Sequence, residues 1–279
     1  MIFFKSIAIP TVLAIASVFS TGIHAETAQF DGKILRIAVN AVYPPMEYHD
    51  PSSGELIGFD IDLGDALAKQ LGAKIEWQES SFAQLLPSLA TQRADLIISG
   101  LNDRAERRTS ADFVDYLNSG AQMFVQATRA KEFPDMTSLC GKKLGMSRST
   151  AFPASVTAWS DNNCVKLGKP AIVVVGSEDS TAARTELKQQ RVDAAVQGSE
   201  TVPYAIQQEP NTYQVVGTPF STTQQGIAFS KHDTVLRNAV GSALVELMRN
   251  GTYSALINKW HLQSSTARGV TINGEEVLK

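Results

Sequence analysis

The stretch SGLNDRAERR, residues 99–108, brings together side chains that could hold a small anion. It follows ADLIIS, whose apolar run is typical of a buried strand, so Ser99 and Gly100 stand where that strand ends. Arg104, Arg107 and Arg108 come next in the chain. A planar guanidinium offers parallel donors that match a carboxylate, whereas clustered arginines are also typical of a solvated helix face. The stretch therefore indicates either a carboxylate site or an exposed basic turn, depending on the elements around it.

The segment before this stretch alternates between strand-like and helix-like patterns. Short β-branched, apolar runs predict strands, and apolar residues at helical spacing predict helices between them. In chain order, the expected elements are a strand at 33–40, a helix at 58–72, a strand at 73–80, a helix at 82–93 and a strand at 94–99. Asp60 is the expected N-cap of the first helix, and Pro87 should disturb the second.

This β-α-β-α-β order predicts a parallel sheet with helices on its faces. Ligands of such sheets bind beyond the carboxyl ends of the strands. Residues 40–43, 80–82 and 99–102 follow the three expected strands. We therefore expect these three segments to converge on one cleft.

The alternation then restarts in a second β/α unit at about 122–216. A strand at 223–231, a long helix at 233–251 and a short helix at 252–261 follow it. The end of the chain, 265–279, is polar and is expected to be a loose tail.

Composition narrows the class of protein. The chain has 279 residues and a net charge of −3, so it lacks the broad basic surface with which proteins neutralise nucleic acid. Residues 1–25 are typical of a secretory signal peptide, with cleavage expected after about Ala25. The alternative is a membrane anchor, but the apolar run is shorter than the roughly 20 residues that a span needs. We expect a soluble, exported mature chain.

The two cysteines are interpreted in that light. Cys140 and Cys164 would meet an oxidising compartment, which favours a structural disulfide over two buried thiols or a redox pair with C-x-x-C spacing. The four histidines are scattered without metal-ligand spacing, so no metal or cofactor is expected.

Several motifs in order resemble the family 3 extracellular solute-binding proteins, the polar amino-acid receptors of ABC importers. They are LRIAVNAVYPPMEY, GFDIDLGDALAKQLG, FAQLLPSLATQRADLIISGLNDRAERR, GKKLGMSRSTA, RVDAAVQG and NGTYSALINKW. The resemblance implies a two-lobed α/β fold, the type II periplasmic-binding-protein fold, with two hinge strands and a ligand cleft between the lobes. Lobe 1 would comprise 30–121 plus 220–264, and lobe 2 would comprise 122–219.

The resemblance also assigns ligand-binding roles in the first lobe. Arg107 matches the arginine that grips the ligand's α-carboxylate, which leaves Arg104 and Arg108 as surface residues. Tyr43 and Phe82 match the aromatic residues on either side of the ligand, although each could instead be a core aromatic. The polar and backbone groups expected to complete the carboxylate cage are Ser99, Gly100 and Asn102.

Four further residues match less firmly. Asn40 and Asp60 match positions that meet the ligand's side chain or hold the cleft wall, and Asp60 competes as a helix cap. In the second lobe, Ser149 and Thr150 match an anion-binding turn, or they only cap the helix that follows. Ala151 stands where the family has a second hydroxyl.

The clearest departure from the family is Gly198, which stands where an aspartate commonly binds the ligand's α-ammonium group. Glu200, two residues on, could replace that carboxylate, or it could be an exposed loop residue. The ligand is therefore an amino acid held in another way, a modified amino acid such as an opine, or an acid without an amine.

Three functions remain open. The first is capture of a small carboxylated solute by a monomeric periplasmic protein that delivers it to an ABC permease. The second is an exported enzyme like the cyclohexadienyl dehydratases, for which Glu200 is the one acid that could be named. The third is a ligand-sensing partner of a membrane receptor. Binding without catalysis is the expected function, because the motifs contain no nucleophile–base pair or metal set.

Overall fold

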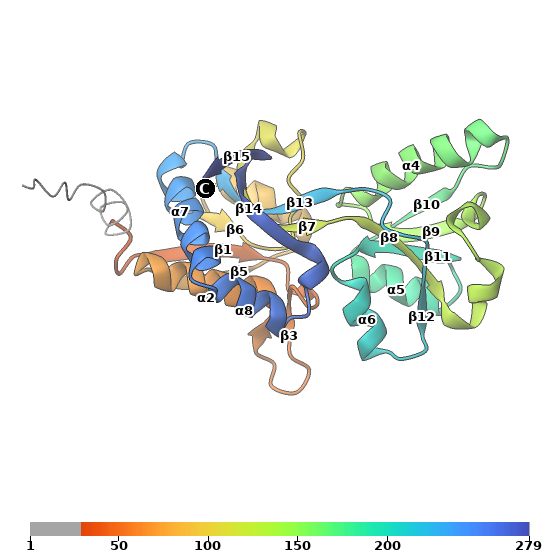
Figure 1. Cartoon of the computed structure of the whole chain (residues 1–279), viewed down its shortest axis with the longest axis horizontal. Helices are drawn as coiled ribbons and strands as arrows, with labels where there is room; N and C mark the ends of the chain where they lie inside the picture. The colour runs from red at the N-terminus through yellow and green to blue at the C-terminus, as the bar shows by residue number, and fades with distance from the viewer. Residues whose placement is uncertain (1–28, 279) are drawn as a thin grey trace, which may run out of the picture.

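The computed structural model describes residues 29–278, which form two α/β lobes side by side (Figure 1). The expected signal peptide lies outside the described residues. No helix within 29–278 is long and apolar enough to cross a bilayer.

The first lobe is built on a seven-stranded sheet in the order β15-β14-β7-β13-β6-β1-β5. Its strands are β1 (Ile34–Val39), β5 (Lys74–Glu79), β6 (Leu96–Ile97), β7 (Ala111–Ser119), β13 (Thr223–Ser230), β14 (Thr266–Ile272) and β15 (Glu275–Leu278). β1 pairs in parallel with both β5 and β6, as the sequence predicts, whereas β13 is antiparallel to β6 and β7. A small sheet of β2 (Val42–Tyr43), β3 (Glu47–His49) and β4 (Leu56–Ile57) follows β1 in the chain.

Helices cover this sheet with apolar faces. They are α2 (Phe59–Leu71), α3 (Leu85–Ala90), α7 (Thr234–Arg249) and α8 (Thr252–Lys259), with the short 3-10 turns η1 (Phe82–Gln84), η2 (Arg107–Thr109) and η6 (Gln263–Ser265). Pro87 lies in the first turn of α3, where its missing N–H breaks no helical hydrogen bond. The main core of the lobe joins α2, α7 and α8 to the sheet through buried leucine, valine and aromatic side chains.

The second lobe repeats the pattern on a smaller scale. Its sheet has the order β10-β9-β11-β8-β12. The strands are β8 (Ala121–Gln126), β9 (Lys143–Ser147), β10 (Val173–Ser177), β11 (Ala194–Gly198) and β12 (Tyr213–Val216). The helices are α4 (Phe152–Asn163), α5 (Ser180–Lys188) and α6 (Val202–Gln208), with 3-10 turns η3 (Ala127–Glu132), η4 (Met136–Leu139) and η5 (Val165–Leu167).

Two segments connect the lobes. β7 ends at Ser119 and β8 begins at Ala121, so Gly120 is the first crossing, and the chain returns between β12 and β13. β7 and β13 pair along their lengths up to Ser119 and Thr223, and they run together toward the second lobe (Figure 1). A hinge motion of one lobe against the other would turn about these two crossings.

The structure corrects the expected loose tail at 265–279. Residues up to Leu278 form β14 and β15, which extend the first sheet beyond β7. Their turn contains Asn273 and Gly274, whose φ angles of 53° and 75° suit a tight hairpin. The Asn-Gly pair is a sequence signal for this hairpin.

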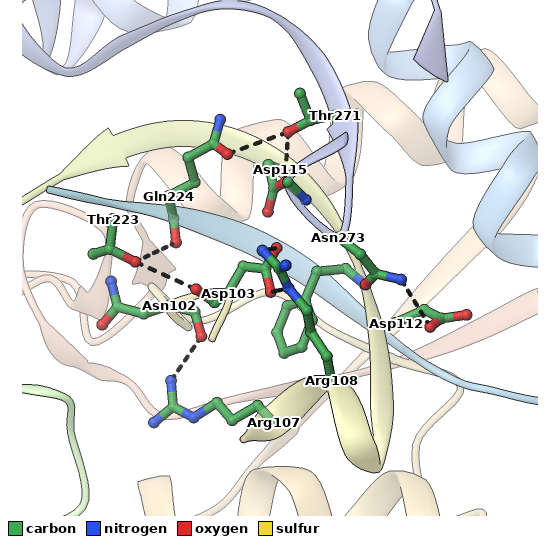
Figure 2. A network of polar contacts seen from close by, with 12 residues as sticks. Asn102, Asp103, Arg107, Arg108, Asp112, Asp115, Thr223, Gln224, Thr271 and Asn273 are labelled. Atoms are coloured by element: carbon green, nitrogen blue, oxygen red, sulfur yellow. Dashed lines mark hydrogen bonds and ion pairs between the residues drawn. The ribbon is translucent and has the colours of Figure 1, made fainter. Parts of the chain in front are cut away.

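Side chains of the hairpin turn also bind β7 (Figure 2). Thr271 Oγ1 donates to Asp115 at 2.5 Å, and Asn273 Nδ2 donates to Asp112 at 3.0 Å. Asp103, held by Arg108 at 2.6 Å, lies next to Asp115. These contacts fix the end of the chain to the strand that leads into the hinge.

The expected N-cap of α2 is also corrected. Gly58 occupies the cap position, and Asp60 lies within the first turn with its carboxylate fully buried. Its oxygens accept hydrogen bonds from the Gly100 N–H at 2.7 Å and the Tyr116 hydroxyl at 2.9 Å. Asp60 therefore ties α2 to the loop after β6 rather than capping its own helix.

The predicted disulfide is confirmed: Cys140 is bonded to Cys164, 24 residues later. It fastens η4 to the end of α4, and Cys164 belongs to the buried core of the second lobe. The bond closes a loop within one lobe and leaves the hinge free to move.

We expect the double substitution Cys140→Ser, Cys164→Ser to lower the free energy of unfolding by about 3 kcal/mol, because the unfolded chain regains the entropy of an open loop. The melting temperature should fall by roughly 6–10 °C. Reductant should lower the melting of the wild type in the same way and should have no further effect on the double variant. Equal melting of the two proteins would show that the bond does not form.

Asp115 predicts a pH dependence of stability. Burial and the neighbouring Asp103 carboxylate raise the pKa of Asp115 to about 7, against an unfolded value of about 3.9. The folded state therefore holds the proton more tightly, and this contribution is fully present below about pH 4 and is lost as the pH rises through about 7. Urea unfolding between pH 5 and 8 should show a smaller loss of stability in Asp115→Asn than in the wild type.

Asp112→Asn is the matched control on the same strand. Although burial acts to raise it, hydrogen bonds from Asn273 and Arg237 lower the pKa of Asp112, so this change should not flatten the fall between pH 5 and 8. Parallel curves for Asp115→Asn and the wild type would contradict the assignment.

Candidate ligand-binding cleft

A pocket lies between the two lobes, with an empty volume of about 430 Å³ including its open mouth. Both lobes contribute to its walls. The first lobe supplies Asn40, Val42, Tyr43, Glu47, Phe82, Gly100 and Asn102, and the second supplies Ser147, Thr150, Phe152, Asp179 and Ser180.

The expected convergence of strand ends is confirmed. Asn40 follows β1, Phe82 begins η1 after β5, and Gly100 and Asn102 follow β6. Because β1, β5 and β6 are parallel neighbours, their carboxyl ends meet at one edge of the sheet. The second lobe brings its own strand ends, at Ser147 after β9 and at Asp179 after β10.

Arg107 lies at the junction of the lobes beside this pocket. Its guanidinium donates to the carbonyl oxygen of Asn102 at 2.9 Å and to that of Ser149, across the cleft, at 3.2 Å (Figure 2 shows the first contact). Burial, with a contribution from Arg104, lowers the pKa of Arg107 to about 10, so the group stays charged at neutral pH. Within residues 29–278 no carboxylate forms an ion pair with it.

Arg104 and Arg108 have other partners, as expected for surface residues. Arg108 pairs with Asp103, and Arg104 lies 3.4 Å from Glu106. Of the three arginines, Arg107 alone donates a side-chain hydrogen bond to the second lobe within the described residues, although neither Arg107 nor Arg104 is among the residues that line the pocket.

The two predicted aromatic residues both line the pocket. Phe82 lies under the Arg107 guanidinium, whose central carbon is 5.7 Å from the ring centroid. Tyr43 reaches across the cleft, where its hydroxyl donates to Glu200 at 3.1 Å and accepts the Gly198 N–H at 3.2 Å. One ring therefore supports the cation, and the other joins the lobes.

The Ser99 hydroxyl does not line the pocket. It accepts the backbone N–H of Asn40 and donates to Glu47 at 2.9 Å. Its place is behind the wall, where it orients Glu47. Asn40 does line the pocket, and its side-chain amide donates to the Ser80 carbonyl at 2.8 Å.

The predicted turn of the second lobe lies at the cleft with its hydroxyl already engaged. Thr150 Oγ1 donates to the Ser147 carbonyl at 2.8 Å and accepts the Phe152 N–H at 3.2 Å, so it caps the start of α4 while lining the pocket. Ser149 presents its carbonyl oxygen, not its hydroxyl, to Arg107.

Glu200 is not the exposed loop residue that the sequence left open, because only 3% of it is accessible. Its carboxylate accepts from Tyr43, from Ser119 on β7 at 2.7 Å and from Gln225 on β13 at 2.7 Å. A Cβ at Gly198 would lie 1.9 Å from the Glu200 carboxylate, so Glu200 fills the space of the missing side chain. It does not line the pocket.

Sequence reasoning missed several lining residues. Asp179 and Ser180 follow β10, and Ser147 ends β9, so the strand-end rule would have found them if extended to the second lobe. Glu47 had no such signal, because it begins the three-residue strand β3 after a proline turn. It is 1% exposed and nevertheless lines the pocket.

Buried acids gather behind Tyr43. Burial, reinforced by the Asp60 carboxylate, raises the pKa of Glu47 well above its usual range. Burial raises the pKa of Asp60 to about 7, against the hydrogen bonds from Gly100 and Tyr116. Burial also raises the pKa of Glu200. No group of three or more potential metal ligands occurs in the described part of the chain.

Comparison with known proteins agrees with this architecture. The family model described as bacterial extracellular solute-binding proteins, family 3, matches residues 35–263. The arginine-binding protein ArgT of Corynebacterium glutamicum is 29% identical over 240 residues, which cover 86% of this chain and 78% of that protein.

Solved structures give the same result. An ancestral arginine-binding protein bound to arginine superposes with a TM-score of 0.73 at 30% identity, covering 81% of this chain and 97% of the other. An ancestral amino acid-binding protein, a precursor of cyclohexadienyl dehydratase, reaches 0.70 at 28% identity, covering 86% and 99%. With its two-lobed fold, its interlobe pocket and a family match over most of its length, the chain belongs to the bacterial extracellular solute-binding proteins of family 3.

Proposed function

We propose that the chain binds an amino acid or amino-acid derivative through its carboxylate, between two lobes that close over it. The protein then delivers this solute to an ABC permease. The relatives support the proposal, since they are named for amino acids.

The proposal rests on Arg107, a charged side chain between the lobes that has no carboxylate partner among the described residues. A charged guanidinium at a protein junction needs acceptors, and the strongest acceptor for it is a carboxylate in bidentate geometry. Within the described residues, the guanidinium donates to two neutral carbonyl oxygens, one from each lobe. A ligand carboxylate beside it would supply the missing negative charge and contact both lobes through one group.

Asn102 supplies a second donor for the same group. It is 4% exposed and lines the pocket, and its Nδ2 is buried without an acceptor among residues 29–278. An unmatched buried donor costs free energy until it is paired. A carboxylate oxygen near Asn102 and Arg107 would pair both.

Closure follows from contacts that exist only when the lobes meet. Besides the bonds of Tyr43 and Arg107, Tyr204 donates to Tyr48 at 3.0 Å across the cleft. A ligand that touches both lobes adds to these contacts and shifts the population toward the closed form. The permease would recognise this closed arrangement of the two lobe surfaces.

We infer that the mature protein works as a monomer in the periplasm after removal of residues 1–25. The leader-like N-terminal sequence and the extracellular character of the family support this location. The same closed surfaces would serve a membrane receptor if the protein acts in sensing, so genes for a permease and an ATPase beside its own would favour import.

The dehydratase alternative has a specific counterpart in the solved precursor of cyclohexadienyl dehydratase. It would need an acid aimed at a leaving hydroxyl. Glu200, the acid named from the sequence, is held by three donors and lies outside the pocket lining. Glu47 is an acid that does line the pocket, so the proposal of binding without turnover rests on the relatives, which are named as binding proteins. Incubation with prephenate or arogenate should give no product.

A thermal-shift screen tests the proposed ligand class. The mature chain is refolded to remove bound solute and mixed with amino acids, opines, other modified amino acids and amine-free carboxylates. A ligand at a thousandfold excess over its Kd should stabilise the protein by about 4 kcal/mol, which raises melting by roughly 10 °C. Agmatine, which is arginine without its carboxylate, is the matched control and should have no effect. Shifts by amines without a carboxylate would contradict the proposal.

Replacing Arg107 tests the carboxylate grip. We expect Arg107→Ala to weaken binding of the best ligand at least 100-fold, because the ligand's charge loses a partly buried partner. Titration calorimetry measures the affinity, and melting of the ligand-free protein should stay within about 2 °C of the wild type.

Arg104→Ala is the matched control from the same segment. Its side chain meets Glu106 at 3.4 Å and, unlike that of Arg107, donates to no group of the second lobe in the described part of the chain, so affinity should be unchanged. A large loss of ligand-free stability in Arg107→Ala, with affinity retained, would show that Arg107 is a structural residue.

A further inference from the structure

One acidic side chain of the pocket has an oxygen to spare. Glu47 Oε1 accepts the Ser99 hydroxyl at 2.9 Å, but Oε2 is buried without a hydrogen-bond donor anywhere in residues 29–278. The residue is 1% exposed and lines the pocket. In the empty cleft Glu47 is protonated and shares a hydrogen bond with the neighbouring Asp60 carboxyl. Once Glu47 is ionised, Oε2 is a buried acceptor without a donor, which is costly, so a residue that lines the pocket in this state would gain from a donor brought by the ligand.

Two other acids lie near the pocket. Asp179 lines it and accepts the Ala182 N–H at 2.7 Å through Oδ1 as the N-cap of α5, whereas its Oδ2 accepts no hydrogen bond in the described part of the chain. Glu200 accepts from three side chains and lies outside the lining, and residue 198 is glycine. Among the described residues, Glu47 is the pocket-lining carboxyl whose unpaired oxygen is buried, whereas Asp179 is partly exposed.

The pocket thus offers an unmatched pair of opposite character. Asn102 Nδ2 is a buried donor without an acceptor, and Glu47 Oε2, once Glu47 is ionised, is a buried acceptor without a donor. Arg107 strengthens the donor side, whereas Asp60 strengthens the acidic side behind Glu47. A zwitterion, with a carboxylate at one end and an ammonium group near it, would satisfy both.

The charges around Glu47 favour a cation. Asp60 on α2 and Glu200 on the second lobe are the acids that act on it, and the hydroxyls of Tyr43 and Tyr116 lie among these carboxyls. None of these three acids forms an ion pair with a lysine, arginine or histidine of the described chain. A ligand ammonium group would bring the positive charge that this cluster lacks.

We propose that Glu47 Oε2 accepts the ammonium group of the ligand, so that the pocket takes zwitterionic amino acids despite Gly198. The inference rests on the proposed function and narrows its ligand class. Opines remain compatible only if their secondary amine is charged, and amine-free acids should bind weakly.

Proton release is a consequence of this role. Burial and Asp60 raise the pKa of Glu47, so the empty cleft holds a proton on this carboxyl at neutral pH. An entering ammonium group needs the ionised acceptor, and the proton therefore leaves to solvent as the ligand binds. Binding of an amino acid should release a proton, whereas binding of its des-amino counterpart should not.

The test compares ligands that differ only by the amine. The probes are the standard L-amino acids and their des-amino counterparts, for example L-arginine with 5-guanidinopentanoate. Affinities are measured by calorimetry for the wild type, Glu47→Gln, Glu200→Gln and Glu79→Gln. Glu79, a half-exposed residue paired with His49, is the control for the same chemical change. Calorimetry of the wild type in buffers of different ionisation enthalpy measures proton release without any variant.

We expect the wild type to prefer an amino acid over its counterpart, and Glu47→Gln to lose roughly 10- to 100-fold in affinity for the amino acid alone. Glu79→Gln should behave as the wild type.

The assignment to Glu47 is overturned if Glu47→Gln still prefers the amino acid over its des-amino counterpart as the wild type does. It is also overturned if only Glu200→Gln loses this preference. Equal proton release with both ligands also overturns it. Binding of amine-free acids as tightly as amino acids overturns the inference and leaves the proposed function standing. Binding of no carboxylate at all overturns both.

Discussion

Placing a guanidinium where two lobes meet costs free energy unless strong acceptors surround it. Arg107 is held there by its loop after β6, with Phe82 beneath it and one carbonyl oxygen from each lobe in front of it. The rest of the cleft is built around this guanidinium. The edge of the first-lobe sheet determines the position of Arg107, and the second lobe supplies the opposite wall of the cleft. A ligand carboxylate would give the guanidinium its charged hydrogen-bond partner.

Hydrogen bonds of Glu200 link the two lobes beside the hinge. Glu200 belongs to the second lobe, yet it bonds Ser119 and Gln225 on the two strands that lead into the crossings, and Tyr43 of the first lobe. Its bond with Tyr43 spans the cleft, so opening the lobes would break that bond and leave a buried acid less well satisfied. Glu200 therefore stabilises the closed form from outside the pocket, whereas Arg107 and Glu47 are the residues that we propose bind the ligand itself.

The sequence was informative where local pattern determines position. Parallel strands bring their carboxyl ends together whatever their side chains, so Asn40, Phe82 and Asn102 could be assigned to one cleft. The cysteine pair could be assigned from the export signal and the pairing of two residues.

Elsewhere the outcome depended on contacts between distant segments. Asp60 has the residue type of an N-cap, but its carboxylate turns inward to Gly100 and Tyr116, which lie far away in the chain. Ser99 follows a strand that ends at the cleft, yet its hydroxyl points away from the pocket and donates a hydrogen bond to Glu47. The orientation of the Glu47 side chain depends on its contact with Ser99, and no periodic pattern in the sequence predicts that contact.

The polar tail was misjudged for a different reason. Its composition is typical of a loose end, but an Asn-Gly turn and three hydrogen bonds made by the side chains of Thr271 and Asn273 attach it to β7. A short turn motif thus outweighed the overall polarity of the segment.

A crystal structure of the mature chain with its tightest ligand from the screen would show where the ligand carboxylate binds. We expect closed lobes, with that carboxylate within hydrogen-bond distance of the Arg107 guanidinium and of Asn102 Nδ2. A ligand whose carboxylate lies elsewhere, with Arg107 still bound only to the carbonyl oxygens of Asn102 and Ser149, would contradict this expectation.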